Sequence, residues 1–462
     1  MFDPQSKYDV VSRDVRIREF LDYWEAFVVR PPYQRKSVWS RKDQQSLLDS
    51  LFRRYYVPRI VIREVRLSEG KTVREIIDGQ QRIITAKAFL SDELPLPKSL
   101  ADVHPALAGA YFKELPVEIR QFVDLELTYT ADIVKGISDP KNPEHQQIAT
   151  GIFERLQQGV SLNYMEVAHA RLSSLSRNFV VQHADDIRFD YETYKPVDDN
   201  PNKHPFFRII NHGNDRMDHL ALLTRFLILE ETDGRGDLQN TNVSEYISGY
   251  QSENGIGNLS FKDEPQARAV LSNLNLFYEV FKNDPMVTGG GVVRELRREY
   301  LIISMYLLLR HLRTLYVFEE AEKALFGNFV YDFYTRWQDR NTKDTDILLF
   351  SDNRQQSSGQ VIERHKILRQ IFFEHTAKQG HEIKEKDTRR AFDESERILL
   401  YRVYDGLCQE CVREGKPQPE CLVPWHEFEA DHVLPHSKGG QTVLDNAELL
   451  FRYHNRQKGA TV

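Results

Sequence analysis

Hydrophobic and polar positions predict a strand–turn–helix unit in the N-terminal third of the chain. Residues 58–65 (PRIVIREV) are rich in β-branched side chains and alternate in polarity, and residues 73–79 (VREIIDG) show a similar pattern that ends in a turn. Residues 80–90 (QQRIITAKAFL) then have helical spacing, which places Ile83 and Phe89 on one face. We therefore expect two strands, the second of which leads through a tight turn into a helix.

The middle of the chain, from about residue 185 to residue 385, has the periodicity of helices. Apolar side chains recur at i, i+3, i+4 and i+7 in residues 217–231 and 292–326. The longest apolar run, residues 300–309, is half as long as a membrane span and is flanked by arginines, so we expect a buried helix. Residues 378–390 are highly charged and contain few apolar side chains, which predicts a linker.

The C-terminal part of the chain has a different pattern. Cys408 and Cys411 form a C-x-x-C pair, and a predicted strand later ends at Asp431 and His432. A Gly-Gly loop follows, and Asn446 then precedes an apolar stretch that we interpret as a helix leading into the sequence HNRQKG. Because side chains alternate across a strand, adjacent Asp and His residues would point to opposite faces, so the strand is expected to end or twist at this position.

Composition and charge limit the class of protein. The 462 residues predict several domains, and no N-terminal apolar run resembles a signal peptide. The three cysteines all lie between Cys408 and Cys421, which excludes a disulfide framework and favours a cytoplasmic location. Because the longest apolar run is too short to span a membrane, we expect no membrane partner. The net charge of −7 predicts weak standing affinity for nucleic acid, with contact through local patches or a bound metal.

The pair Asp431–His432 has the chemistry of a metal-dependent hydrolase. Hydrolysis of a phosphodiester at neutral pH requires a base, a divalent cation and a scaffold that holds both. Histidine is the natural base, and Mg²⁺ prefers oxygen ligands, which Asp431 and an asparagine amide can supply. The alternative is a structural turn of satisfied polar residues, although several spaced elements in order favour the hydrolase. His436 matches no role and is expected in a surface loop.

These spaced elements resemble the HNH endonucleases, whose pattern contains C-x-x-C, D-H-x-x-P, G-G, N and N-x-x-K-G. The matching positions in this chain are Cys408, Cys411, Asp431 to Pro435, Gly439, Gly440, Asn446, Asn455, Lys458 and Gly459. The resemblance implies a ββα-metal fold over residues 388–462. It also implies that His432 is the general base and that Asp431 and Asn455 bind Mg²⁺ or Mn²⁺. In the same way, Asn446 would orient the base through the loop, and Lys458 would contact the phosphate.

One part of the HNH pattern is altered in this chain. Where the family has a second C-x-x-C, the sequence has Phe451 and His454. Structural zinc usually has four nitrogen or sulfur ligands. Cys408, Cys411 and His454 would supply three of them, and Cys421 is a candidate for the fourth. The alternative to Zn²⁺ is a small apolar core in which the cysteines are buried thiols.

A second polar cluster lies where the predicted N-terminal strand passes into its helix. Backbone N–H groups at a helix start favour a phosphate, and the sequence Asp78-Gly79-Gln80-Gln81-Arg82 adds amide donors and a guanidinium. Upstream, Gln34 and Arg35 form another Gln-Arg pair between aromatic residues. The alternative is a well-capped helix with a solvated arginine.

The context of this cluster, over about residues 10–175, resembles the GmrSD-like N-terminal family, also called DUF262, whose signature is D-G-Q-Q-R. That family is similar to ParB and sulfiredoxin folds. The resemblance implies that a nucleoside triphosphate is bound or hydrolysed, and leaves ATP, GTP and CTP open. The implied nucleotide-binding residues are Asp78, Gly79, Gln80, Gln81, Arg82, Gln34 and Arg35.

Together these features predict an α+β multidomain chain. The expected domains are a ParB/sulfiredoxin-like domain at 1–180, a helical middle at 181–387 and an HNH domain at 388–462. The pairing resembles modification-dependent restriction and phage-defence nucleases, which implies a DNA endonuclease acting on foreign or modified DNA under nucleotide control. A double-strand cut would need two HNH sites or two events, which favours a homodimer. Two alternatives stay open: a ParB-like nucleotide switch with a non-cleaving HNH end, and an HNH nickase or RNA-cleaving toxin.

Overall fold

The structure is a computed structural model that describes residues 7–34, 39–67, 70–156 and 163–460. It contains two compact units, one formed by residues 1–272 and 356–358 and the other by residues 273–355 and 359–462. Helices and strands in both units confirm the predicted α+β class. Within the described parts of the chain, no helix is long and apolar enough to cross a membrane. The three-domain division stays a prediction, because compactness alone does not test which segments fold independently.

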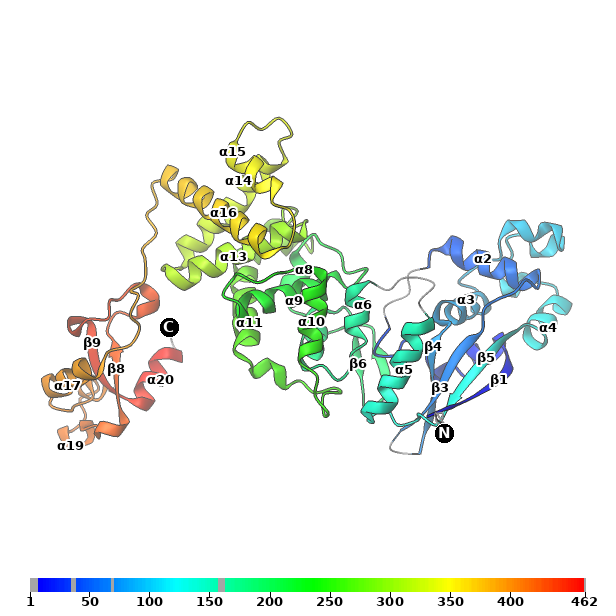
Figure 1. The fold of residues 1–462 in the computed structure, drawn as a ribbon, viewed down its shortest axis with the longest axis horizontal. Coiled ribbons are helices and arrows are strands. Elements are labelled where there is room, and N and C mark those ends of the chain that lie inside the picture. Colours follow the sequence, from blue (N-terminus) through cyan, green and yellow to red (C-terminus); the bar gives the residue numbers. More distant parts are fainter. Residues whose placement is uncertain (1–6, 35–38, 68–69, 157–162, 461–462) are drawn as a thin grey trace, which may run out of the picture. The chain divides into compact units, whose positions relative to one another are not determined.

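A five-stranded mixed sheet is the core of the N-terminal part of the first unit (Figure 1). Its strands lie in the order β1-β5-β3-β4-β2. The bounds are Asp9–Arg16 for β1, Phe27–Val28 for β2, Ile60–Arg66 for β3, Thr72–Asp78 for β4 and Thr128–Lys135 for β5. Strands β3 and β4 and helix α3 (Gln80–Leu90) confirm the predicted strand–turn–helix unit. Strand β3 lies between β4, to which it is antiparallel, and β5, to which it is parallel.

The central strands of this sheet are buried on both faces, because their alternate residues pack on opposite sides. Ile60, Ile62 and Ile76 face a core that also contains side chains of four helices. These helices are α1 (Ile17–Asp22), α2 (Arg41–Phe52), α3 and α4 (Val117–Leu125). Val61 and Ile77 face the other side, where α5 (Pro143–Leu156) contributes to a second core. The end of β4, where the Asp78 turn begins, is therefore held from both sides.

The remainder of the first unit is mostly helical, as the periodicity predicts. Its main helices are α6 (Tyr164–His169), α7 (Leu175–Ala184), α9 (Asp218–Glu231) and α10 (Asn240–Gly249). One difference is a short hairpin of β6 (Arg188–Asp190) and β7 (Lys195–Val197). Tyr194, before β7, has a φ of +52° and is fully buried, and its hydroxyl donates to Glu75. This tertiary contact explains why a local periodicity did not predict the hairpin.

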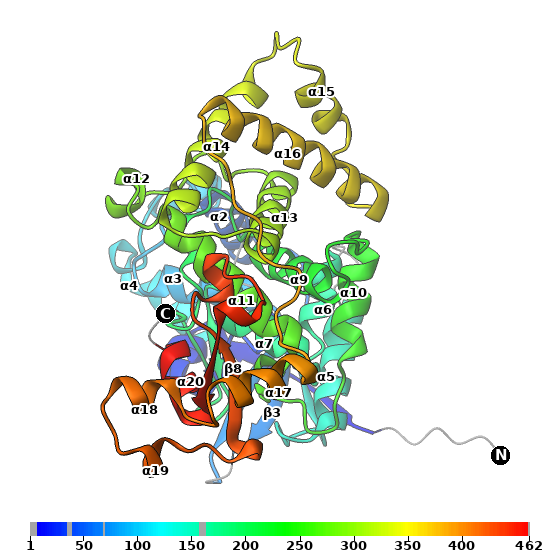
Figure 2. The same ribbon diagram turned by 90° about the vertical axis from the view of Figure 1, so that its left-hand side faces the viewer.

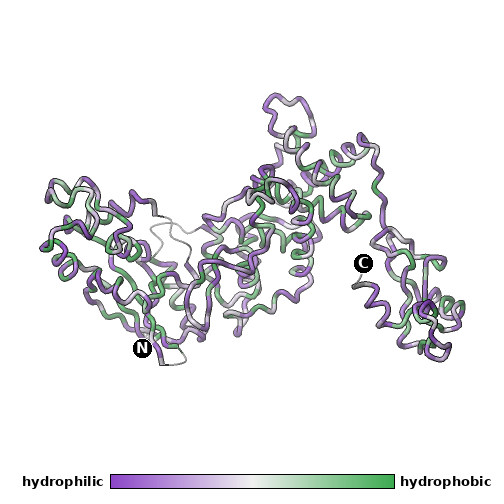
Figure 3. Tube along the Cα trace, turned by 180° about the vertical axis from the view of Figure 1, so that it is seen from behind, coloured by the Kyte–Doolittle hydropathy of each residue, from purple (hydrophilic) through white to green (hydrophobic). Residues whose placement is uncertain are grey.

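In the second unit, the longest apolar run of the sequence forms a buried helix, as predicted. Residues 301–309 of α13 (Glu299–Leu315) are all buried. The neighbouring helices are α14 (Glu320–Gln338), α15 (Thr345–Asp352) and α16 (Ser358–Lys378). The hydropathy colours of Figure 3 show how apolar and polar segments alternate along these helices.

Residues 379–392 connect α16 to the C-terminal elements and run mostly as turns and extended chain, in agreement with the predicted linker. This segment is anchored along its length: Glu385 forms a β-bridge with Tyr316, and the Lys386 N–H donates to the carbonyl of Leu315 at 2.8 Å. The linker is therefore a strap with defined partners.

The C-terminal elements surround a two-stranded antiparallel sheet, and Figure 2 shows them in orange to red. Their bounds are α17 (Glu394–Val403), α18 (Gln409–Arg413), α19 (Gln418–Cys421), β8 (Phe428–His432), β9 (Ala447–Phe451) and α20 (Arg452–Ala460). The stretch after Asn446 is thus a strand, and its interpretation as a helix was wrong. A run of five residues is too short for its own periodicity to decide, and pairing with β8 determines its conformation.

Candidate active site

Asp431 and His432 are the last two residues of β8, so the strand ends at the predicted position, with both residues still paired in the hairpin. In the hairpin register Asp431 lies opposite Glu448, and His432 lies opposite Ala447. The chain then leaves the sheet, and the Val433 N–H donates to the carbonyl of Asn446 at 2.9 Å. The two residues therefore share the rim of one hairpin.

The His432 side chain is enclosed and fixed on several sides. The residue is 6% exposed, its ring lies 4.8 Å from that of Phe392, and its Nε2 is 3.0 Å from the Thr442 hydroxyl. Burial lowers the pKa of His432 from its ordinary value, against an opposing effect from the Asp431 carboxylate. The imidazole is therefore mainly neutral at pH 7, which is the form that can accept a proton.

Asn446 holds the loop that joins the two strands. Its Oδ1 accepts from the Leu434 N–H at 2.8 Å, and its Nδ2 donates to the carbonyls of Leu434 and Gln441. A Cβ at Gly440 would lie 1.8 Å from the Leu434 carbonyl oxygen, so only glycine fits beside this amide. The Asn446 amide therefore contacts the loop backbone. The resemblance to HNH endonucleases implies that Asn446 orients His432 through these contacts.

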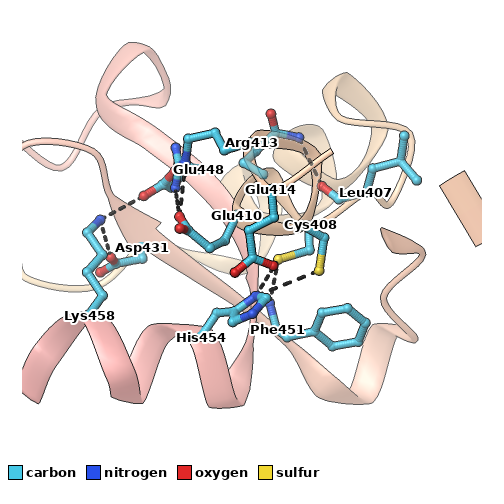
Figure 4. Close-up of polar contacts among 12 residues, drawn as sticks. Leu407, Cys408, Glu410, Arg413, Glu414, Asp431, Glu448, Phe451, His454 and Lys458 are labelled. Carbon is cyan, nitrogen blue, oxygen red and sulfur yellow. Dashed lines mark hydrogen bonds and ion pairs between the residues drawn. The ribbon is translucent and has the colours of Figure 1, made fainter. Parts of the chain in front are cut away.

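Lys458 points from α20 into a group of oxygen atoms at the strand ends (Figure 4). Its Nζ lies 2.7 Å from Asp431 Oδ2, 2.7 Å from Glu448 Oε1 and 2.6 Å from the His432 carbonyl oxygen. Glu448 is buried and also accepts from Arg413 at 2.8 Å. The ammonium thus marks a position where two carboxylates and a carbonyl stabilise positive charge.

The donor atoms at this position fit a hard divalent cation. Carboxylate and carbonyl oxygens are the ligands that Mg²⁺ and Mn²⁺ prefer. Asn455, on the same helix as Lys458, is fixed through its amide nitrogen, which donates to Glu429 Oε2 at 2.7 Å. Its amide oxygen is then the atom that Asn455 can offer to a cation. The structure brings Asp431 and Lys458 into contact, whereas the hydrogen-bond partner of Asn455 is Glu429.

The predicted zinc ligands form a partial site. One ligand atom from each of Cys408, Cys411 and His454 lies within 4.8 Å of the other two, and Cys408 Sγ is 3.2 Å from His454 Nδ1. Burial and the neighbouring Cys408 raise the pKa of Cys411 to about 11, so a bound metal would replace a thiol proton. In the described part of the chain, Cys421 is not in this group; its Sγ is near the Lys416 carbonyl at 3.5 Å.

The Asp78 turn has the tight geometry that the sequence predicts. Gly79 has a φ of +98°, and a Cβ there would lie 2.3 Å from Ile60 Cγ2. The Arg82 guanidinium pairs with Asp78 and donates to the Pro58 carbonyl at 2.8 Å, so it closes the turn from within the protein. Gln34 Nε2 donates to two carbonyls at the end of β4, which places Gln34 directly beside the turn.

Other groups at the turn are suited to a ligand. Gln80 is buried, and its Nε2 has no hydrogen-bond partner among the residues that the structure describes. Helix α3 begins at Gln80 after Gly79, which has no side chain to cap the first N–H groups. Gln81 is half-buried in the same first turn, and Arg35 lies outside the described residues. This set of donors fits an anionic ligand.

Comparison with known protein families agrees with this geometry. The model of the GmrSD restriction endonuclease, N-terminal domain, matches residues 17–411, and the HNH endonuclease model matches residues 408–461. The chain belongs to the GmrSD N-terminal domain family. None of the curated proteins compared with the chain matches it.

The two matches also establish the type of enzyme. A GmrSD N-terminal domain followed by an HNH endonuclease domain makes the chain a restriction-type nuclease, a hydrolase of phosphodiester bonds with DNA as its substrate. This result disfavours the non-cleaving nucleotide switch. HNH nucleases use divalent metals, in agreement with the oxygen-rich position beside Asp431.

Several residues around the two candidate sites were not predicted from the sequence. Thr442 contacts His432, Glu448 faces Asp431, and Asp387 accepts from the Thr442 N–H at 2.7 Å. Glu448 could have been recognised from the sequence, because it interrupts an apolar strand, whereas Thr442 and Asp387 are polar residues in polar stretches.

In the first unit, Glu75 is buried and accepts from the hydroxyls of Tyr33 and Tyr194. This network holds the segment that carries Gln34 against β4.

Proposed function

We propose that this nuclease of the GmrSD family is a metal-dependent DNA endonuclease of a restriction system against phage. It cuts foreign or modified DNA at the HNH site, and a nucleoside triphosphate at the Asp78 turn controls the cut. The observation that carries the proposal is the rim of the β8–β9 hairpin. There a buried His432 lies next to an oxygen-lined cation position.

In the proposed reaction, His432 accepts a proton from the attacking water. Asp431 and Asn455 hold Mg²⁺ or Mn²⁺, and the Glu448 carboxylate adds negative charge at the same position. The cation supplies charge neutralisation on the phosphate and the leaving oxygen. Asn446 keeps the loop in place. Lys458 contacts Asp431 and Glu448 in the structure, and it turns to the phosphate when the cation takes this position. The Cys408, Cys411 and His454 group holds a structural Zn²⁺ that ties the start of the HNH domain to α20.

The nucleotide site is proposed at the start of α3. Gln80, Gln81 and the first N–H groups of the helix donate to phosphate oxygens, with Gln34 and Arg35 beside them. The Asp78–Arg82 pair holds the turn, and Gly79 allows it. The buried Gln80 Nε2, which has no partner among the described residues, supports this assignment. The identity of the triphosphate is decided by the experiment below.

Further parts of the proposal concern the whole protein. The chain acts in the cytoplasm, which its free cysteines support. The domains are residues 1–180, 181–387 and 388–462. A homodimer supplies two HNH sites for a double-strand cut.

The test is cleavage of plasmid DNA by the purified full-length protein with Mg²⁺ or Mn²⁺. Host DNA and modified phage DNA are compared with and without ATP, GTP or CTP. We expect metal-dependent cutting that His432→Ala abolishes and that the exposed-residue control His426→Ala retains. Gln80→Ala should remove the response to the nucleotide. Metal-independent cutting, or equal cutting by His432→Ala, would contradict the proposed site.

Two further substrates distinguish the proposed DNA endonuclease from the remaining alternative, an HNH nickase or RNA-cleaving toxin. Supercoiled plasmid distinguishes nicked from linear product, and a single-stranded RNA of matched sequence tests RNA cleavage. Exclusive cleavage of RNA would replace the restriction proposal with a toxin. A nicked product that is never linearised would remove the argument for paired HNH sites.

A further inference from the structure

Thr442 is a buried residue of the HNH loop whose hydroxyl has two partners. The residue is 0% exposed. Its Oγ1 lies 3.0 Å from His432 Nε2 and also donates to the backbone carbonyl of Arg389. The hydroxyl therefore lies between the proposed general base and the linker that precedes the HNH domain.

The direction of these two hydrogen bonds follows from the number of protons. A threonine hydroxyl has one proton, and a carbonyl oxygen can only accept. Because the Thr442 proton is directed at Arg389, the hydroxyl can take part in the contact with His432 only as an acceptor. The His432 Nε2 must then carry a proton and donate it, which leaves the lone pair of the neutral imidazole on Nδ1.

The linker holds Thr442 in place through its backbone as well. Asp387 Oδ2 accepts from the Thr442 N–H at 2.7 Å, and the Arg389 guanidinium donates to the Thr442 carbonyl. The Asp387 carboxylate is itself fixed, because its Oδ1 accepts from the Arg389 N–H at 2.9 Å. The Asp387 carbonyl accepts from His436 Nε2 at 2.8 Å. Thr442 is thus tied to the linker by its N–H, its carbonyl and its hydroxyl.

We propose that Thr442 is a positioning residue that fixes His432 as the Nε2–H tautomer, and that Asp387 and Arg389 of the linker hold Thr442 for this purpose. Nδ1 is then the atom that accepts the proton of the attacking water. The catalytic part of this inference rests on the proposed role of His432 as general base. The tautomer and the hydrogen bonds that set it do not depend on that role.

The arrangement connects the two family matches at the active site. Asp387 and Arg389 lie in the region that matches the GmrSD N-terminal model and outside the HNH match, whereas His432 and Thr442 lie inside the HNH match. The linker is anchored in turn by the bridge between Glu385 and Tyr316 at the end of α13. Residues before the HNH motif therefore decide which nitrogen of its histidine carries the proton.

The test uses the full-length protein with Thr442→Val, which removes the hydroxyl but keeps the branched shape, and Thr442→Ser, which keeps the hydroxyl. Histidine side chains are labelled with ¹⁵N, and ring nitrogen shifts report the tautomer; His432→Ala identifies the signal. We expect the Nε2–H form in the wild type and in Thr442→Ser, and a mixture of tautomers in Thr442→Val. The kcat of DNA cleavage should fall about 10- to 100-fold in Thr442→Val at unchanged KM, as for loss of a residue that orients a catalytic group.

Two other variants complete the experiment. Asp387→Ala, which releases the Thr442 backbone, should lower kcat about tenfold on the same reasoning. Thr376→Val is the control, because Thr376 is also buried and donates to a backbone carbonyl, that of Phe373, within α16. It should cut DNA at the wild-type rate, and thermal melting of each variant verifies folding.

Each outcome decides the proposal. A Thr442→Val protein that retains the Nε2–H tautomer overturns it, and so does a Thr442→Ser protein as impaired as Thr442→Val, because packing would then explain the loss. If the wild type cuts no DNA, the proposed function fails, while the nitrogen shifts still determine whether Thr442 sets the tautomer.

Discussion

Two glycines stand where a side chain would collide with the structure around a proposed site. A Cβ at Gly79 would lie 2.3 Å from Ile60 Cγ2, and a Cβ at Gly440 would lie 1.8 Å from the Leu434 carbonyl oxygen. Gly79 also has a φ of +98°, which side-chain-bearing residues rarely adopt. The shape of the Asp78 turn therefore depends on the absence of one side chain.

Substitution at Gly79 should reveal both effects. Gly79→Ala should lower the free energy of unfolding by about 2–5 kcal/mol, the sum of the left-handed backbone penalty and overpacking against Ile60. Gly70→Ala is the matched control, since Gly70 has a φ of +73° and no atom of the described residues would lie within 4 Å of its Cβ. It should lower that energy by only about 1–2 kcal/mol, the backbone penalty alone. Urea unfolding measures both variants, and equal losses would contradict the predicted collision.

The residues that the sequence predicted at the HNH site are those with a fixed chemistry and spacing. Asp431 and His432 were predicted because a carboxylate and an imidazole side by side suit phosphodiester hydrolysis, and Lys458 was predicted from the resemblance to the HNH pattern. Thr442 could not be predicted, because its role depends on one proton and on a carbonyl 53 residues earlier in the chain. A hydroxyl in a polar loop has no periodicity that would reveal such a partner.

At the scale of elements, α18, the end of β9 and α20 bring the thiols of Cys408 and Cys411 and the imidazole of His454 together. Cys408 and Cys411 flank the start of α18, and His454 lies in the first turn of α20. Phe451, at the end of β9, donates its N–H to Cys408 Sγ at 3.4 Å. Cys421 is buried in the same apolar core but has a different partner. The three elements therefore define which cysteines can share a metal.

Zinc content distinguishes these cysteines. We expect about one zinc ion per chain in the purified protein, because two thiols and an imidazole are typical ligands of structural zinc, with a near-complete loss in Cys411→Ser. Cys421→Ser should retain the metal, because its thiol lies outside the ligand group. Elemental analysis by mass spectrometry measures the content. Loss of zinc in Cys421→Ser would show that Cys421 is the fourth ligand, and a metal-free wild type would favour the apolar core.

Helices and strands could be predicted where their pattern of apolar residues was long, or where a strand pattern changed to a helix pattern at a turn. Strand β4 and helix α3 follow such a pattern, and α13 follows a long apolar one. The short strand β9 was interpreted as a helix, and the hairpin β6–β7 was missed. Both depend on contacts with distant residues, β9 on pairing with β8 and the hairpin on burial of Tyr194 beside Glu75.

At the scale of the whole molecule, the net charge of −7 opposes unspecific contact with DNA. Proteins that coat DNA gain affinity from many lysine and arginine contacts with phosphates. In this chain Lys458 is paired with two carboxylates. A nuclease with this balance should bind DNA weakly until a cation or a regulatory ligand changes the charge at the site.

This expectation can be measured on the His432→Ala protein, which should bind DNA without cutting it. In the absence of nucleotide and divalent metal, its Kd for an unmodified duplex should be weaker than about 1 µM at physiological salt, the range of unspecific binding. Affinity should fall further as salt rises. Fluorescence anisotropy with a labelled duplex measures it, and nanomolar binding under these conditions would contradict control by charge.

The anchoring of Thr442 by residues 387 and 389 has a consequence for how such nucleases can be recombined. A chimera joined at residue 408, where the HNH match begins, would inherit the histidine, the carboxylates and the glycine loop. It would lack the carbonyl and carboxylate that hold the hydroxyl, so its histidine could exchange the proton between both nitrogens. The segment that must be transferred is therefore longer than the HNH motif by which it is recognised. An active chimera would have to be joined upstream of Asp387.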